Sequence, residues 1–548
     1  MQRALRSRVL LVGPYDPACG EYTFVSPPLG VWRLAGTLSS AGVDVEVFDP
    51  NCCETRPEDE LEHLVTSRSW DVIGFSTTGM TLRYDLALAH LARRAQPHAL
   101  LVAGGMEATF NTDKVLELGP FDFAVLGEGE RPMLTLSQRV SSGADPRGIA
   151  GTAWRRADGT VERLTHPALT REELRDSIFN VPYERMPYEA YWRKLEHAYQ
   201  VNGLPFKAER EARLAEIRSV RLITLNYCPM NCSFCSSTNF LHAAQGSTAR
   251  MARLDADECV AMVERIVSAC PGVRTVIFQD DIFVFPNDAR VLPLCEGIVN
   301  AKACGRIPPD LQFISTNRID SMNEERLTAM RRAGFRVLGF GVENVALPVL
   351  IEFNKARIHP LIERVLSTAL ELGIVPFLDM IMTSPLCGIQ DVAENVRQAY
   401  RWTVAGCEVG LYPYVIPFSG AAMSRDPTLL PETVYVRHEV AGTTIAWDQP
   451  SKILPRRPEV RGAILEIERA FDARIAVLEG EVAHLPSRLR SLVWVMSAAP
   501  ILERMGHAMP DADEVERHLL MRLPGLTGAR HVRVLELLED WRAASKVA

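Results

Sequence analysis

The sequence predicts an α/β protein with a doubly wound (Rossmann-like) N-terminal sheet, a partial (β/α)6 barrel and a helical C-terminal region. Three observations support this prediction. Short apolar runs alternate with amphipathic stretches from Val9 to about Val140, and the alternation resumes at a longer period from Val220. After about Pro427 helical patterns dominate. Alternation of this kind is typical of parallel sheets covered by helices.

The length of the chain implies several domains. At 548 residues it is too long for one hydrophobic core. We expect an N-terminal sheet domain at residues 1–140, a linker at 141–218, a barrel at 219–426 and a helical domain at 427–548.

Five buried strands and four helices are expected in the first domain. The strands are Val9–Gly13, Val43–Phe48, Asp71–Phe75, Leu100–Gly104 and Phe123–Leu126. The helices are Gly30–Ser40, Pro57–Ser67, Leu82–Ala95 and Lys114–Leu118. Ligands of such sheets bind beyond the carboxyl ends of the strands.

Residues suited to binding a large ligand, mostly glycines and hydroxyl residues, follow three of these strands. They are Ser76, Thr77, Gly104, Gly105, Gly127 and Glu128. Glycine lets a backbone approach a ligand closely, and hydroxyls form adaptable hydrogen bonds, although each loop alone is also ordinary turn chemistry. No Gly-x-Gly-x-x-Gly opens the first helix, so a nicotinamide dinucleotide is disfavoured.

The predicted linker contains two features. A small hairpin is expected around Asp158-Gly159. The Pro- and Tyr-rich stretch Val181–Tyr188 either crosses the domain junction or simply joins the two domains, and both readings stay open here.

Six strand–helix units are expected in the barrel. The strands are Arg221–Tyr227, Val273–Gln279, Leu311–Ser315, Val337–Val342, Val375–Met382 and Val409–Val415. Helical patterns between them include Asp255–Ser268, Asn323–Ala333 and His359–Leu372. Chemistry in such barrels takes place at the carboxyl ends of the strands. The C-terminal region is expected to form helices at Glu459–Leu485, Asp513–Leu523 and Val532–Ser545.

Composition excludes several classes of function. The apolar fraction of 47% and charged fraction of 23% are those of a globular protein, and the net charge of −8 disfavours nucleic acid as a partner. We expect no signal peptide and no membrane span. Twelve cysteines without a signal peptide argue against a disulfide scaffold and favour a reduced cytoplasm.

The strongest motif is the Cys-x3-Cys-x2-Cys run formed by Cys228, Cys232 and Cys235, which follows the apolar stretch Leu222–Leu225. Three thiolates on one loop can hold three irons of a 4Fe–4S cluster and leave the fourth iron open. A structural zinc site normally needs four ligands, for which His242 is the nearest further candidate.

At these residues the chain resembles the radical S-adenosylmethionine (SAM) enzymes, with Phe234 before the last cysteine. The resemblance implies that the open iron binds SAM, which is cleaved to a 5′-deoxyadenosyl radical. The stretches Phe278–Phe283 and Gly341–Glu343 match the SAM-contacting strands, which makes Asp280 and Glu343 candidate SAM contacts.

Arg318 is a candidate partner of the SAM carboxylate. Structural alternatives exist: Asp280 or Asp281 can cap the next helix, and Arg318 can pair with Asp320. Pro417–Gly420 resembles the Pro-x-Pro-Gly turn of these enzymes, with its second proline replaced.

The first domain resembles the cobalamin-binding domain of radical SAM enzymes. The resemblance rests on Pro27–Gly30, Gly74–Ser76, Ala103–Gly105 and Gly127–Glu130. It implies that the nucleotide tail of cobalamin threads between the sheet and its helices, with Ser76 and the Gly104-Gly105 pair lining the slot. Domains that ligate cobalt from below carry Asp-x-His-x-x-Gly after the first strand, whereas Tyr15–Gly20 has no histidine. We therefore expect no histidine ligand on the lower cobalt face.

The leading hypothesis is a cobalamin-dependent radical SAM methyltransferase that acts on a small-molecule or natural-product intermediate, using a 5′-deoxyadenosyl radical and methylcobalamin. The expected cofactors are a 4Fe–4S cluster, SAM and cobalamin, with an external reductant such as flavodoxin or ferredoxin. The alternatives are a cobalamin-dependent radical SAM cyclase or ring-rearrangement enzyme, and a non-catalytic cobalamin-binding protein. No residue is assigned a catalytic role.

Overall fold

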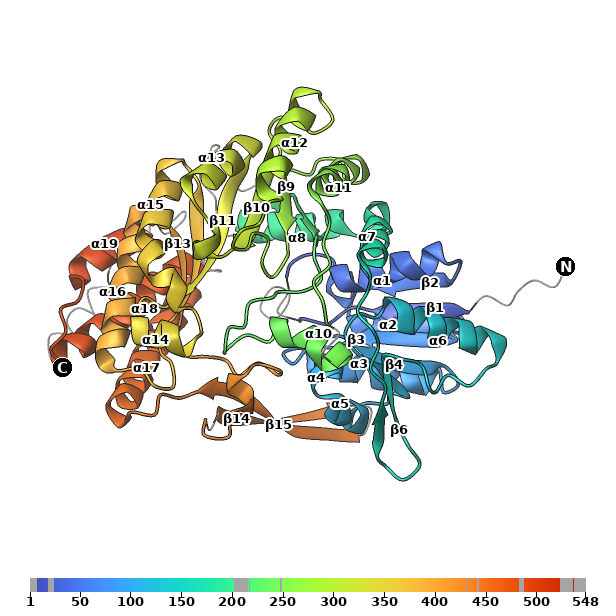
Figure 1. Ribbon diagram of the computed structural model, residues 1–548. Coiled ribbons are helices and arrows are strands. Elements are labelled where there is room, and N and C mark those ends of the chain that lie inside the picture. The colour runs from blue at the N-terminus through green and yellow to red at the C-terminus, as the bar shows by residue number, and fades with distance from the viewer. Residues whose placement is uncertain are drawn as a thin grey trace.

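A computed structural model of the chain shows two parallel sheets joined by an aromatic segment and bridged by a C-terminal hairpin (Figure 1). It describes residues 7–17, 24–201, 215, 217–246, 249–429, 431–440, 443–481, 487–522 and 536. In this part of the chain no helix is long and apolar enough to cross a membrane. The α/β fold class is confirmed.

The first sheet has its five parallel strands in the order β2-β1-β3-β4-β5. They are β1 Arg8–Val12, β2 Asp44–Phe48, β3 Val72–Ser76, β4 Leu100–Gly104 and β5 Phe123–Val125. The five predicted strands are thus confirmed. Because β1 lies between β2 and β3, the chain changes direction at β1, and the loops after β1 and β3 open a crevice at the carboxyl edge.

Helices cover both faces of this sheet. One face packs against α1 Leu29–Ser40 and α6 Glu130–Ser142, and the other against α2 Pro57–Ser67, α3 Leu82–Ala95, α4 Met106–Phe110 and α5 Thr112–Leu118. Successive residues of a strand point to opposite faces, so Leu10 and Val12 belong to one core and Val9 and Leu11 to the other. Burial on both faces explains the uninterrupted apolar runs.

The predicted hairpin at Asp158-Gly159 is confirmed, and it continues the first sheet. Strand β6 Thr152–Arg155 pairs antiparallel with β5, and β7 Val161–Arg163 pairs with β6. The domain boundaries at residues 140, 218 and 426 stay predictions.

The Pro- and Tyr-rich segment contacts both sheets. It contains η2 Tyr183–Arg185, and it lies between α7 Arg171–Phe179 and α8 Tyr188–Val201, which begins at its last residue. The Tyr183 hydroxyl donates to the carbonyl of Arg221 in the barrel at 3.1 Å, whereas the Tyr191 hydroxyl donates to Asp49 at the end of β2. Of the two readings of this segment, the structure therefore shows the one in which it crosses the junction.

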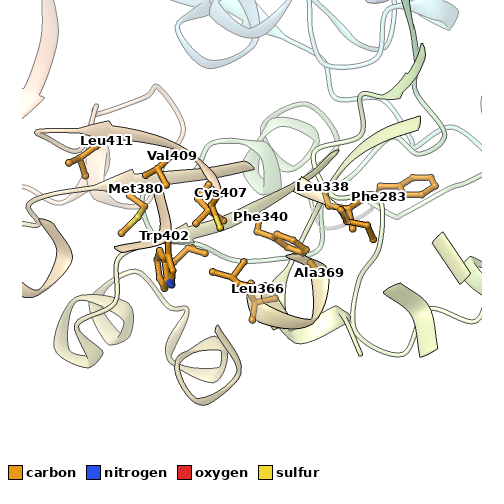
Figure 2. Close-up of a cluster of buried hydrophobic side chains, with 14 of the residues drawn as sticks. Phe283, Leu338, Phe340, Leu366, Ala369, Met380, Trp402, Cys407, Val409 and Leu411 are labelled. Atoms are coloured by element: carbon orange, nitrogen blue, oxygen red, sulfur yellow. The ribbon is translucent and has the colours of Figure 1, made fainter. Parts of the chain in front are cut away.

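The second sheet is an open barrel of six parallel strands in the order β13-β12-β11-β10-β9-β8, which confirms the predicted (β/α)6 unit. They are β8 Ser219–Leu222, β9 Thr275–Phe278, β10 Gln312–Asn317, β11 Phe335–Glu343, β12 Val375–Ile381 and β13 Glu408–Tyr412. The main covering helices are α11 Ala256–Ala269, α12 Val291–Ala303, α13 Glu324–Ala333, α15 Ile362–Glu371 and α16 Ile389–Ala405. Figure 2 shows Leu338, Met380 and Val409 of the strands packed with Leu366 and Trp402 of the helices.

The C-terminal region corrects the prediction of a mostly helical tail. It begins with a hairpin of β14 Pro431–Val440 and β15 Thr443–Ile453, which extends back to the first domain (Figure 1). Ile445 and Trp447 pack into the core beneath α3 and α5. The polar–apolar alternation of these residues is a strand pattern that the helical prediction overlooked.

Three helices follow the hairpin. Helices α17 Pro458–Glu481 and α19 Ala512–Arg522 confirm two predicted helices, and the third, Val532–Ser545, lies outside the described residues apart from 536. Helix α18 Ser487–Arg504 was not predicted. It covers the edge strand β13, where the Ser491 hydroxyl accepts the Leu411 N–H and donates to the Val409 carbonyl.

Candidate functional site

The carboxyl edges of the two sheets face one large cavity of about 1210 Å³. Its walls come from four places: the edge of the first sheet, the cysteine loop, the turn after β13 and strand β15. The residues that define these walls are Thr78, Gly79, Met106 and Glu107; Phe234, Cys235, Ser236 and Ser237; Pro417, Phe418, Ser419 and Gly420; and Asp448, Gln449 and Pro450. The Asn111 amide donates to the Ser419 hydroxyl at 2.7 Å and so links two of these walls directly.

The cysteine loop follows β8 and is fastened to the segment after β11. The Ser233 N–H donates to the Phe353 carbonyl at 3.3 Å, and the Ser233 hydroxyl donates to the Glu352 carbonyl at 2.7 Å. The Asn354 amide donates to the Asn231 carbonyl at 2.7 Å. These bonds hold the middle of the loop at the mouth of the barrel.

The thiols of this loop lie in a shielded environment. Burial raises the pKa of Cys228 to about 12 and also raises that of Cys232, while the nearby charges of Lys355 and Arg318 act in the opposite direction. An Arg318 N–H points at the Cys232 sulfur, 3.9 Å from Nη1. A soft metal that binds the thiolates would overcome the cost of burying their charge.

The donor set fits an iron–sulfur cluster in its chemistry. The thiols of the loop lie close together: the charges of Cys235 and Cys232 both raise the pKa of Cys228, and the charge of Cys235 raises the pKa of Cys232. Among the described residues, no three His, Cys, Asp or Glu side chains are already gathered as a metal site. Both ring nitrogens of His242 have partners: Nε2 the Tyr227 hydroxyl at 2.9 Å and Nδ1 the Gly246 carbonyl at 3.1 Å. A zinc site completed by His242 therefore has no support.

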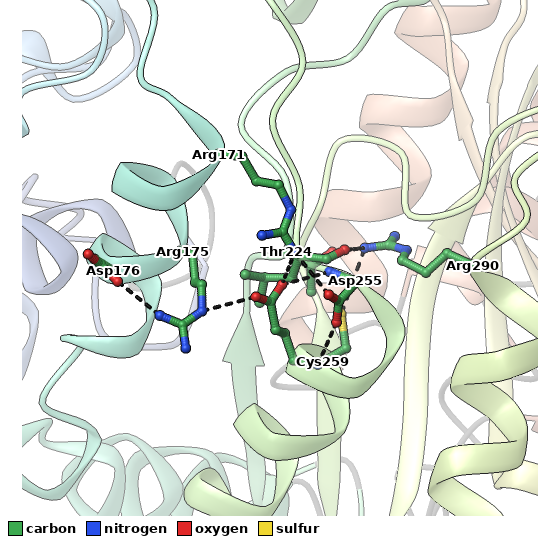
Figure 3. Close-up of polar contacts among 9 residues, drawn as sticks. Arg171, Arg175, Asp176, Thr224, Asp255, Cys259 and Arg290 are labelled. Carbon is green, nitrogen blue, oxygen red and sulfur yellow. Dashed lines mark hydrogen bonds and ion pairs between the residues drawn. The ribbon is translucent and has the colours of Figure 1, made fainter.

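Asp280 fixes the start of the cysteine loop. Its carboxylate accepts the N–H groups of Thr224 at 2.6 Å and Leu225 at 3.0 Å and the Thr224 hydroxyl at 2.7 Å. Arg290 donates to the same hydroxyl at 2.9 Å (Figure 3). Burial raises the pKa of Asp280 to about 6. Asp280 therefore has a structural role in this loop, and its contact with SAM stays a prediction.

The neighbouring carboxylate, Asp281, has a different environment. It is accessible and lines a second cavity, yet burial of its carboxylate raises its pKa. An acid that is accessible and at the same time surrounded by protein faces an internal hollow.

Glu343 ends β11 in a strained conformation, with φ of 61°. Its carboxylate accepts a hydrogen bond from Lys355 at 2.7 Å, and Lys355 also donates to the Gly341 carbonyl at 2.6 Å. Arg318 forms a two-point ion pair with Asp320 at 2.7 and 3.0 Å, which is the structural alternative stated above. The SAM contacts of Glu343 and Arg318 stay predictions.

A polar row crosses the barrel interior next to Glu343. The strand register places Asp379 of β12 between Gly341 of β11 and Gly410 of β13. A Cβ at Gly410 would lie 3.1 Å from the Asp379 carboxylate and 3.2 Å from the Tyr412 hydroxyl. Burial and the charge of Glu343 raise the pKa of Asp379 to about 7. The sequence placed Asp379 inside the fifth strand but gave no sign of these neighbours.

The second cavity, of about 320 Å³, lies between the first sheet and the cysteine segment. It contains five of the predicted cobalamin residues, namely Ser76, Gly104, Gly105, Gly127 and Glu128. Its apolar floor is made of Leu11, Val102, Val125 and Met133. The small residues and the apolar floor fit a flat aromatic group such as the base of a nucleotide tail.

Of the predicted cobalamin residues, Thr77 is absent from the described part of this cavity's lining. It is fully buried, donates to the Gly104 carbonyl at 2.9 Å and accepts the Ala108 N–H at 3.2 Å. Its role is to join β3 to the loop after β4. Gly105 has φ of 92°, and a Cβ there would lie 2.7 Å from the Thr77 carbonyl oxygen.

The loop after β1 is only partly described, because Ala18, Cys19 and Gly20 lie outside the described residues. Its described part is held by α3 and by the turn after β2, since the Tyr15 N–H donates to Asp85 at 2.9 Å and the Asp16 N–H donates to Asn51 at 2.9 Å. The expected lack of a lower histidine ligand stays a prediction.

Comparison with known sequences identifies a B12 binding domain at residues 15–137. The chain is 25% identical over 342 residues to an uncharacterized methyltransferase, PH0819, of Pyrococcus horikoshii, covering 61% of this chain and 64% of that protein. It is 25% identical over 412 residues to the anaerobic magnesium-protoporphyrin IX monomethyl ester cyclase of Rubrivivax gelatinosus, covering 72% of this chain and 65% of that protein. The chain thus spans just under two thirds of either relative.

Solved structures match almost the whole chain. TsrM of Kitasatospora setae, a radical SAM methyltransferase solved with cobalamin and a [4Fe-4S] cluster, superposes with a TM-score of 0.61 at 17% identity, covering 99% of this chain and 100% of that chain. OxsB, a cobalamin-dependent SAM radical enzyme, superposes with a TM-score of 0.67 at 14% identity, covering 98% of this chain and 83% of that chain. The chain therefore has a B12-binding domain and the overall fold of the cobalamin-dependent radical SAM enzymes.

Proposed function

We propose that the protein is a cobalamin-dependent radical SAM methyltransferase that acts on a small-molecule or natural-product intermediate. The observation that carries the proposal is the shared cavity. Cys235 and its neighbours lie on one wall, and the carboxyl edge of the B12-binding domain forms another. A substrate in this cavity would meet both cofactors at once.

Residues for each cofactor are present. Cys228, Cys232 and Cys235 would hold the 4Fe–4S cluster, and the second cavity would hold the nucleotide tail of cobalamin. When bound, the cluster and SAM supply a carbon-centred radical, and cobalamin supplies a methyl group. TsrM, which has the same fold, is a methyltransferase solved with both cobalamin and the cluster.

The chain's own residues supply charge and shielding. Arg318 and Lys355 favour the thiolate form of Cys232. Asp281 and Glu343, whose charges act on Cys228 and Cys232, would accept hydrogen bonds from the ammonium and ribose groups of SAM bound at the cluster. Strand β15 closes one side of the large cavity and limits the access of water, which protects a reactive radical.

A cyclase or ring-rearrangement activity is the second candidate. It is favoured by the match to the Rubrivivax cyclase, which extends over more residues than the match to PH0819. Both functions require an electron donor, and flavodoxin or ferredoxin is the proposed one.

Nucleoside analysis with the true substrate tests the proposal. A radical methyltransferase consumes one SAM for the methyl group and one for the radical. We therefore expect equal amounts of S-adenosylhomocysteine and 5′-deoxyadenosine per methylated product. A cyclase would give 5′-deoxyadenosine alone, polar methyl transfer would give S-adenosylhomocysteine alone, and a non-catalytic cobalamin protein would give neither.

A further inference from the structure

Glu128, in the loop after β5, accepts hydrogen bonds from both ends of the cysteine segment, residues 226–245. Its Oε1 accepts a hydrogen bond from the Asn226 amide at 3.0 Å, and its Oε2 accepts one from the Gln245 amide at 2.8 Å. Asn226 stands two residues before Cys228, and Gln245 ends α10 Ser237–Gln245, the helix that follows the cysteines. One carboxylate thus joins the two ends of the segment that carries the predicted cluster ligands.

These bonds have a defined direction. The Asn226 Oδ1 accepts the Ala252 N–H at 2.8 Å, so its amide nitrogen is the group turned toward Glu128. Glu128 is only 4% exposed, and burial and the charge of Glu130 raise its pKa, while the two amide donors favour its charged form. Hydrogen bonds to a buried charge are stronger than those between neutral groups.

A close backbone approach strengthens the contact. Gly127 has φ of 66°, and a Cβ there would lie 2.6 Å from the Cβ of Ala244 in α10. Beside it, the His166 N–H donates to the Ala244 carbonyl at 3.4 Å, and its ring nitrogen Nε2 lies 3.0 Å from the Leu126 carbonyl oxygen. Helix α10 therefore rests directly on the loop after β5.

The same loop lines the second cavity. The opposite wall of that cavity belongs to the cysteine segment and its neighbours, through Ile223, Leu225, Asn226, Phe240 and Leu241. A molecule in this cavity would touch both the sheet and the segment that carries the cysteines. Glu128 joins the two walls through its hydrogen bonds to Asn226 and Gln245.

We propose that Glu128 is a positioning residue that couples occupation of the second cavity by cobalamin to the arrangement of the cysteine loop. Cobalamin and the cluster then each bind more tightly when the other is present, by the same factor, because such coupling is reciprocal. The identity of the two ligands rests on the proposed function.

The test measures the cobalamin affinity of the full-length protein with and without the reconstituted cluster. In the wild type we expect the cluster to tighten cobalamin binding by about fivefold or more. In Glu128→Gln the new amide group faces an amide donor, so one of the two bonds to the cysteine segment is lost. In Glu128→Ala both of these bonds are lost, together with the one from the Leu169 N–H at 3.4 Å. In both variants the ratio of the cobalamin affinities measured with and without the cluster should be near one.

Glu130→Gln is the matched control. Glu130 lines the same cavity and pairs with Arg33 at 2.6 Å, yet among the described residues it forms no hydrogen bond to the barrel. This variant should weaken cobalamin binding while keeping the wild-type ratio. Asn226→Ala offers a second route to the same result if the Glu128 variants do not fold, and the double variant should lose no more coupling than either single one.

The outcomes are distinct. A wild-type ratio near one, or an unchanged ratio in both Glu128 variants and in Asn226→Ala, overturns the coupling while leaving the proposed function standing. Failure of the wild-type chain to bind cobalamin or a cluster contradicts the proposed function itself and the coupling with it.

Discussion

The carboxyl edges of the two sheets differ in how they meet the shared space. In the first sheet the polar side chains are used within the protein, as Thr77 and Glu128 show, and glycines leave an apolar slot. In the barrel, charged groups remain at the edge, among them Asp281, Asp379 and the Glu343–Lys355 pair. The first edge is suited to recognising shape and the second to recognising charge. The following predictions test this difference, from the largest effect to the smallest.

Replacing Cys228, Cys232 and Cys235 together with Ala should abolish SAM cleavage and iron binding. Cobalamin should stay bound, because the predicted cobalamin residues of the second cavity lie at the edge of the first sheet. Iron content, 5′-deoxyadenosine and cobalamin absorbance measure these effects. Cys304→Ala, at an exposed cysteine outside the loop, is the control. Survival of iron and of SAM cleavage in the triple variant would refute the assignment of the cluster.

Lys355→Met should destabilise the protein by about 3–5 kcal/mol, because it leaves the carboxylate of Glu343 without its buried partner. Denaturant unfolding measures the loss. Adding Glu343→Gln should recover much of it, since the uncompensated charge is then gone. If the double variant is as unstable as Lys355→Met, the lysine acts through packing and the electrostatic account of this edge is wrong.

Gly105→Ala should cost about 1–3 kcal/mol through its strained φ and close approach to the Thr77 carbonyl, and it should weaken cobalamin binding. Gly143→Ala is a matched control, since Gly143 has a φ of 69° with no atom within 4 Å of a new Cβ. It should share only the part of the cost that comes from the positive φ, and it should keep full cobalamin affinity, measured by titration. Equal cobalamin affinities of the two variants would contradict the assignment of the second cavity to cobalamin.

Asp379→Asn should change how stability depends on pH. The pKa of Asp379 in the folded protein is raised to about 7, so between about pH 4 and pH 7 the folded state binds more protons than the unfolded state. Stability then falls as pH rises through this window, and the variant should lose that part of the decline. Thermal unfolding from pH 5 to pH 8 measures it, with the exposed Asp59→Asn of α2 as control. Parallel curves for wild type and Asp379→Asn would show that the carboxyl titrates normally.

Much of the fold was readable from the sequence, because strands buried on both faces leave uninterrupted apolar runs. The C-terminal hairpin and α18 were not predicted. The hairpin has an alternating pattern interrupted by charges, and α18 is apolar on several sides because it lies against β13. Such elements are defined by their tertiary partners.

The site was predicted unevenly. The cysteine motif is local, so its spacing was sufficient. Asp280 and Asp281 are adjacent in the sequence and could not be distinguished there, because only the position of Thr224 makes the first structural. The hydrogen bond between Glu128 and Asn226 joins residues about a hundred positions apart, and no local sequence pattern predicts it.

The central claim is that both cofactors face one cavity, and electron paramagnetic resonance tests it without a substrate. The protein would be loaded with cobalt(II) cobalamin and the reduced cluster, separately and together. We predict that the doubly loaded protein shows broadened or split signals, because two unpaired spins in one cavity interact. A spectrum equal to the sum of the two separate spectra would place the cofactors far apart and contradict the account.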